Sequence, residues 1–174
     1  MNALTVEAVN ATRFRIDPEV VDRLVADVLR GEGVADGELG VRFVGERRMR
    51  DLNREFRGHD EVTDVLAFPL EEGAVGAGHE AAGARGRGDG DAVVDDLAAR
   101  GLPRLLGDVV VCPRRAAAQA RAAGTPLAFE VAMLLVHGTL HVLGYDHEVD
   151  AGEMALRQAR YLGDASWENL LGQA

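Results

Sequence analysis

The segment His137-Gly-Thr-Leu-His141-Val-Leu-Gly144-Tyr-Asp-His147 holds three of the five histidines of this 174-residue chain. His137 and His141 are four residues apart, so on a helix they lie on the same face, one turn from each other. Gly144 can end that helix by adopting a left-handed conformation, which costs glycine little. The chain then turns back, and we expect His147 to reach the same point in space as the other two imidazoles.

Three neutral imidazoles that converge from a helix and a turn are typical of a tetrahedral metal site, most often a zinc site. With three protein ligands the fourth position stays open for water, which is the arrangement of a catalytic rather than a structural metal. We therefore predict one Zn²⁺ per chain, held by His137, His141 and His147.

The residue after the first histidine bears on what such a metal does. Metzincin peptidases share this histidine spacing but carry Glu after the first histidine, as general base. Here that position is Gly138, so the pattern favours metal-assisted hydrolysis of another kind. Two alternatives stay open. One is a metzincin-like metallohydrolase or peptidase whose base comes from Glu130 or Glu148, and the other is a structural zinc closed by Asp146.

The charge of the chain is unevenly distributed. Apolar residues make up 47% of the sequence, and the net charge is −10 at neutral pH. A net negative charge repels the phosphates of nucleic acid, so the overall charge argues against a nucleic-acid partner. Residues 42–57, however, hold six arginines against three acidic residues and predict a local basic face on an acidic body.

The N-terminal residues show no basic segment followed by an apolar run, so we expect no signal peptide. The longest apolar stretch, residues 127–136, is interrupted by Glu130 and is too short to span a membrane. The single cysteine, Cys112, cannot form an internal disulfide, which fits a reducing cytosol. Because Cys112 lies in an apolar run, we expect it to be structural rather than a nucleophile.

Hydrophobic periodicity predicts an α+β (mixed α/β) protein, with a single small four-stranded mixed sheet, about five to six helices packed against it, and the metal site in a cleft. The strands are expected at residues 4–9, 39–44, 63–68 and 105–112. The helices are expected at residues 18–31, 46–56, 113–123 and 151–162, and from Pro126 through His141.

Residues 1–174 are predicted to form one domain. The strand at 105–112 is nearly continuous in apolar residues, so we expect it in the middle of the sheet, and Pro69 is expected to stop the strand before it. Between residues 71 and 104 the composition shifts to Gly, Ala and charged residues without periodicity. This composition predicts a long, flexible surface insertion.

Three further stretches point in one direction together with the histidine segment. They are Leu52-Asn-Arg-Glu-Phe-Arg57, Thr63-Asp-Val-Leu-Ala-Phe-Pro69 and Leu106-Gly-Asp-Val-Val-Val-Cys112. In this order, the four segments resemble the YbeY family of bacterial metal-dependent endoribonucleases over most of the chain. The departures are mild: Phe56 replaces the usual Tyr, Ala67 replaces Ser, and the insertion is longer than is typical.

The resemblance implies a function and a set of site residues. His137, His141 and His147 match the zinc ligands of the family, and Arg57 and His137 are its expected catalytic residues. The expected activity is single-strand-specific cleavage of ribosomal RNA in the cytoplasm, in maturation of the 16S 3′ end and in ribosome quality control. The expected partners are the small ribosomal subunit and ribosome-associated proteins. A non-catalytic assembly factor with structural zinc is the alternative.

Three aspartates are candidates for orienting the histidine rings by hydrogen bonding, because metal-bound imidazoles usually donate their second N–H to a carboxylate or carbonyl. These candidates are Asp64, Asp108 and Asp146. Each of them also has an ordinary explanation as a cap or turn residue.

Overall fold

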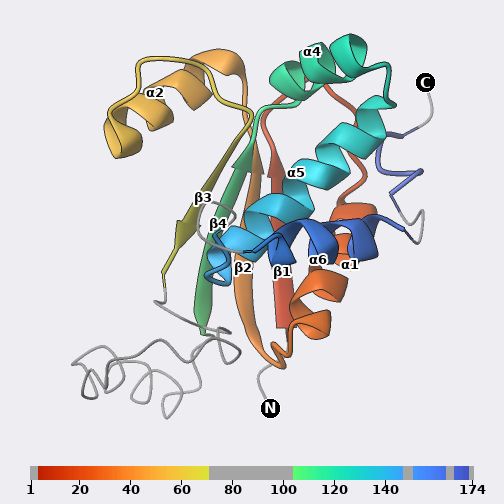
Figure 1. The fold of residues 1–174 in the computed structure, drawn as a ribbon. Coiled ribbons are helices and arrows are strands. Elements are labelled where there is room, and N and C mark those ends of the chain that lie inside the picture. The colour runs from red at the N-terminus through yellow and green to blue at the C-terminus, as the bar shows by residue number, and fades with distance from the viewer. Residues whose placement is uncertain (1–3, 71–103, 147–150, 164–166, 173–174) are drawn as a thin grey trace.

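The sheet has four strands in the spatial order β1-β2-β4-β3 (Figure 1). The computed structural model describes residues 4–70, 104–146, 151–163 and 167–172. The first two neighbouring pairs, β1 with β2 and β2 with β4, are parallel, whereas β3 runs antiparallel to β4 at the sheet edge. The predicted mixed sheet is therefore confirmed. The strands are β1 (Leu4–Asn10), β2 (Gly37–Phe43), β3 (Val65–Pro69) and β4 (Leu105–Val111).

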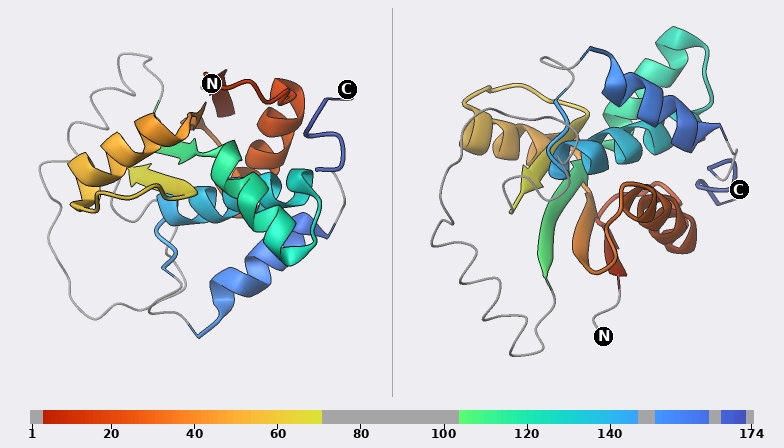
Figure 2. Two further views of the ribbon diagram at one scale, coloured as in Figure 1. Left: turned by 90° about the horizontal axis from the view of Figure 1, so that it is seen from above. Right: turned by 60° about the horizontal axis from the view of Figure 1, so that its bottom comes forward.

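Helices cover the two faces of the sheet unequally. Seen from above, α2 and α5 lie on opposite sides of β3 and β4 (Figure 2). The main core lies on the α5 side, where α1 and α5 pack against the strands and α4 and α6 pack against α5. The helices described are α1 (Pro18–Gly31), α2 (Glu46–Arg57), α4 (Pro113–Ala123), α5 (Leu127–Val142) and α6 (Glu153–Leu162).

The end of α5 follows from local sequence. Gly144 has φ 94°, the left-handed conformation predicted for it. Its N–H donates to the His141 carbonyl at 3.0 Å, and the Tyr145 N–H donates to the Leu140 carbonyl at 3.1 Å. These two bonds form a Schellman motif, which satisfies carbonyls that the last helical turn leaves without partners. The predicted helix end at Gly144 is confirmed.

The third strand differs slightly from its prediction. It begins at Val65 rather than residue 63, and Pro69 belongs to it, paired with Gly107 of β4. Proline has no N–H to donate, but among the described residues no strand pairs with the outer side of β3, and proline is tolerated on such an edge strand. The strand at 105–112 lies inside the sheet, between β2 and β3, as predicted. Apart from Arg104, the predicted insertion at 71–104 falls outside the described residues.

A buried carboxylate joins three elements that are distant in sequence. Glu32, at the C-terminal end of α1, is 5% exposed. It accepts hydrogen bonds from the hydroxyls of Tyr145 at 2.7 Å and Tyr161 at 2.6 Å, and from Arg157 Nη1 at 2.7 Å. Burial by itself raises the pKa of the Glu32 carboxyl, but the hydrogen bonds from the two phenols and Arg157 hold that pKa below its ordinary value. Glu32 therefore stays ionised and fastens α1 to α6 and to the turn after α5.

The lowered pKa of Glu32 predicts a pH-dependent contribution to stability. The contribution is complete above the ordinary carboxyl pKa of 4.5 and is lost as the pH falls through the lower pKa of the folded state. Urea unfolding of the wild type and Glu32→Gln should therefore show a difference in unfolding free energy that is constant near neutral pH and narrows below about pH 4.5. A difference that stays the same down to pH 3 would contradict this assignment.

Candidate metal centre

The two histidines of α5 face each other. His137 Nε2 and His141 Nε2 are 3.1 Å apart. Their ring centroids are 4.6 Å apart, and the rings meet edge to face at 79°. Both side chains are partly buried, so they are shielded without being closed off from solvent. The predicted placement of these two residues on one face of a helix is confirmed.

Gln158 of α6 contacts His137 from outside α5. Its Oε1 lies 3.2 Å from His137 Nδ1. An amide oxygen can only accept, so the contact is a hydrogen bond in the tautomer that carries its proton on Nδ1, and in that tautomer Nε2 keeps its lone pair for a metal. No sequence pattern marks Gln158 as a site residue, because the contact depends on how α6 packs against α5.

The distance between the two Nε2 atoms suits a shared metal ion. With metal–nitrogen bonds of about 2.0–2.1 Å and tetrahedral angles, two ligands of one zinc lie about 3.3 Å apart, close to the observed 3.1 Å. The third predicted ligand, His147, lies outside the described residues. Within the described part of the chain, no group of three His, Cys, Asp or Glu residues is placed to hold a metal. The histidine pair thus fits zinc, and the complete triad stays a prediction.

Gly138 has a packing role. A Cβ at this position would lie 2.6 Å from Val109 Cγ1 and 3.2 Å from Val65 Cγ2. Glycine therefore lets α5 approach β3 and β4 closely, and a glutamate here would point into the sheet. Glu130, another candidate base, is buried in the first turn of α5 and accepts from Thr125 Oγ1 at 2.5 Å.

The hydrogen bond from Thr125 holds Glu130 at the N-terminal end of α5, far from the histidines. Glu148 lies outside the described residues. Neither position 138 nor Glu130 therefore supports a peptidase base at this centre.

Arg57 belongs to α2, the helix that lies on the opposite side of β3 and β4 from α5 (Figure 2). It is exposed in the last turn of α2, which Gly58 ends in the left-handed conformation. Arg50 and Arg54 of the same helix bind Asp60, whereas no described residue forms an ion pair with Arg57. Phe56, beside it, packs edge to face on Phe68 of β3, with ring centroids 5.0 Å apart. Edge strand β3 thus lies between the helix that carries Arg57 and the helix that carries the histidines.

The three aspartate candidates have different surroundings. Asp64 accepts from Gln119 Nε2 at 2.7 Å and from the Val65 N–H at 2.8 Å, so it links the start of β3 to α4. Asp108 faces away from α5, because its neighbour Val109 is the residue that meets Gly138. Asp146 is exposed in the turn after α5. Asp64 therefore has structural partners of its own, and Asp108 forms an ion pair with Arg42 at 3.6 Å.

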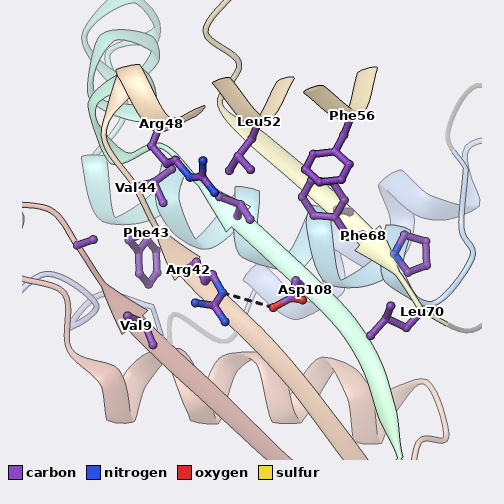
Figure 3. A pocket seen from close by; sticks show the side chains of 14 residues that line it. Val9, Arg42, Phe43, Val44, Arg48, Leu52, Phe56, Phe68, Leu70 and Asp108 are labelled. Carbon is purple, nitrogen blue, oxygen red and sulfur yellow. Dashed lines mark ion pairs between the residues drawn. The ribbon is translucent and has the colours of Figure 1, made fainter. Parts of the chain in front are cut away.

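A groove of about 760 Å³ lies on the α2 side of the sheet. Figure 3 shows Arg42 and Asp108 on its floor, joined by an ion pair of 3.6 Å, with Phe56 and Phe68 along one wall. Arg48 of α2 and Leu70 also line it. The histidines do not line this groove. The groove therefore does not test the prediction that the metal lies in a cleft.

A family profile and individual relatives with the same name match most of the chain. The family profile described as Endoribonuclease YbeY matches residues 7–165. A protein of that name from Salinispora tropica is 39% identical over 95% of this chain and 98% of its own length. One from Bacillus cytotoxicus is 37% identical over 83% of each chain. A Thermotoga maritima protein with a known solution structure shares the fold, with a TM-score of 0.58 and 24% identity over 94% of this chain and 90% of that one.

These matches first define a class, that of hydrolases named as endoribonucleases. More particularly, the chain belongs to the Endoribonuclease YbeY family. Among the helices described, none has the length and apolar character that crossing a bilayer requires.

The close contact at Gly138 predicts a specific packing cost. Gly138→Ala should lower the unfolding free energy by about 1–3 kcal/mol, because the added methyl forces α5 away from Val109. Urea unfolding measures this loss. Gly163→Ala is the matched control, since a Cβ there meets its nearest atoms at an ordinary 3.5 Å, and it should change the unfolding free energy by less than about 1 kcal/mol. Equal effects of both variants would contradict the packing role.

Proposed function

We propose that this chain is a zinc-dependent, single-strand-specific endoribonuclease that acts on ribosomal RNA. The observation that carries the proposal is the pair of facing Nε2 atoms of His137 and His141, 3.1 Å apart, in a chain of this family. His147 is the proposed third ligand. Three neutral imidazoles leave one position of a tetrahedral zinc for solvent or substrate.

The protein groups around the metal have separable roles. When bound, zinc supplies a Lewis acid and lowers the pKa of its water to about 7. His137 and His141 are proposed to hold the ion through Nε2. His137, which contacts Gln158 of α6, is also proposed as a catalytic residue. Gln158 accepts from His137 Nδ1 and keeps the ring turned toward the ion.

Arg57 is proposed to bind the phosphate at which cleavage occurs. A guanidinium is permanently charged and can donate two parallel hydrogen bonds to non-bridging oxygens. Within the described residues Arg57 has no ion-pair partner, so its charge is available to a phosphate. Because β3 separates it from the histidines, this role requires RNA to pass around that edge strand.

The groove on the α2 side offers a path for unpaired RNA. Phe56 is 59% exposed, and exposed aromatic rings stack on bases that are not paired in a duplex. Arg42 and Arg48 line the same groove and can contact the backbone. Stacking of this kind favours single strands, which supports single-strand specificity.

The biological substrate rests on family resemblance. We propose maturation of the 16S 3′ end and ribosome quality control in the cytoplasm, with the small ribosomal subunit and ribosome-associated proteins as partners. The basic arginines of α2 support an RNA partner despite the net charge of −10. The test is the 3′ end of 16S RNA in cells depleted of this protein, where uncut precursor should accumulate.

The metal ligands give the most direct test of the proposed chemistry. His141→Ala should reduce bound zinc from about one ion per chain to near zero and abolish cleavage of single-stranded ribosomal RNA. Elemental analysis and a gel-based cleavage assay measure the two effects. His59→Ala, a change in the exposed loop after α2, is the control and should keep both. If the wild-type protein binds zinc through four protein ligands and does not cleave RNA, the result would instead support the structural-zinc alternative.

Arg57 can be tested independently of the metal. Arg57→Ala should keep its zinc and lower kcat for RNA cleavage by about 10²-fold, the effect of removing one donor to the transition state. Arg47→Ala, an exposed arginine in the first turn of the same helix, is the control and should keep kcat. A rise in KM with unchanged kcat would place Arg57 in RNA binding only, and unchanged cleavage would remove it from the site.

A further inference from the structure

The buried carboxylate of Glu32 has no part in the proposed chemistry, yet it touches the elements that build the metal centre. Its side chain is 1% exposed in an ion pair with Arg157. Burying a charge is costly unless its hydrogen bonds are complete. Glu32 meets that condition with three donors, all within 2.7 Å.

Two of the three donors come from one face of α6. Arg157 and Tyr161 are four residues apart, so both point from that helix toward Glu32. A Cβ at Gly31 would collide with the Tyr161 ring, so glycine before Glu32 makes room for this contact. The carboxylate therefore sets both the position of α6 and its rotation about its own axis.

Rotation of α6 decides where Gln158 points. Gln158 directly follows Arg157, and its Oε1 lies 3.2 Å from His137 Nδ1. A turn of the helix that released Arg157 from Glu32 would carry Gln158 away from His137, because the two side chains are attached to the same rigid turn of helix.

The third donor holds the other side of the centre. Tyr145 is the last residue of the Schellman motif that ends α5, four residues after His141. Its hydroxyl binds Glu32, and the Arg157 guanidinium lies 4.8 Å from its ring centroid. One carboxylate thus fastens the end of α5, which carries the histidines, to α6, which carries their partner.

We propose that Glu32 is a positioning residue of the metal centre, acting through α6 to keep Gln158 against His137. This inference rests on the proposed zinc function. A buried apolar residue at position 32 could fill the same space, but it would not set the rotation of α6, because hydrophobic contact has no direction.

The test compares two buried glutamates. Zinc affinity is measured by competition with a chromophoric chelator, and the ligand field is measured by the visible spectrum of the Co²⁺-loaded protein. Glu32→Gln should weaken zinc binding about 10-fold or more, the effect of losing partners that orient a metal ligand, and should alter the Co²⁺ spectrum. Glu130→Gln is the matched control: Glu130 is 6% exposed and lies at the far end of α5, so zinc affinity should stay within about 2-fold.

A double-mutant cycle shows whether Glu32 acts through Gln158. If it does, Glu32→Gln should have little further effect on zinc affinity in a Gln158→Ala background, since residues that act through one contact are not additive. Tyr161→Phe removes one donor from α6 and provides a milder variant if Glu32→Gln does not fold. It should weaken zinc binding in wild type but not in the Gln158→Ala background.

The outcomes separate this inference from the proposed function. A wild-type protein that binds no zinc would overturn the proposed function, and this inference with it. Tight zinc binding by wild type, equalled by both Glu32→Gln and Tyr161→Phe, would overturn the inference alone. Additive losses in the cycle, or an equal loss in Glu130→Gln, would show that Glu32 only stabilises the fold.

Discussion

The close packing of α5 against β3 and β4 is the constraint on which the rest of the structure depends. Gly138 allows it, because any larger residue would press on Val109 and Val65. With α5 held this close, Gly138 faces the sheet, while the neighbouring His137 contacts Gln158 of α6 and His141 contacts His137. The same glycine leaves no room for the general base that a metzincin carries at this position, so one packing contact bears on both fold and chemistry.

Edge strand β3 contacts both the helix of the histidine pair and the groove on the α2 side. On one face Val65 meets α5 beside the histidine pair. On the other face Phe68 packs against Phe56 at the wall of the groove. Alternate residues of a strand point to opposite faces, so a single short strand carries contacts to both surfaces. Within the part of the chain that the structure describes, no further strand pairs with β3 on its outer side.

Polar contacts over long sequence distances surround the candidate metal centre. Glu32 and its three donors bring together residues from α1, the turn after α5, and α6. The carboxylate at its centre is buried and accepts hydrogen bonds on both oxygens, which makes the network directional in a way that apolar packing is not. Through it, the orientation of a histidine on α5 depends on the last turn of α1.

The sequence by itself determined the local parts of this protein. Helix α5, its two histidines on one face and its end at Gly144 follow from spacing and glycine chemistry within a few residues, and the family follows from four short segments in order. Only the tertiary structure decided that Gln158 contacts His137, that Glu32 binds Tyr145, and that Arg57 and Asp108 lie across the sheet from α5. The two hydrogen bonds join residues 21 and 113 positions apart, and the placement of Arg57 and Asp108 depends on strand order. Hydrophobic periodicity carries no information about which distant polar groups will meet.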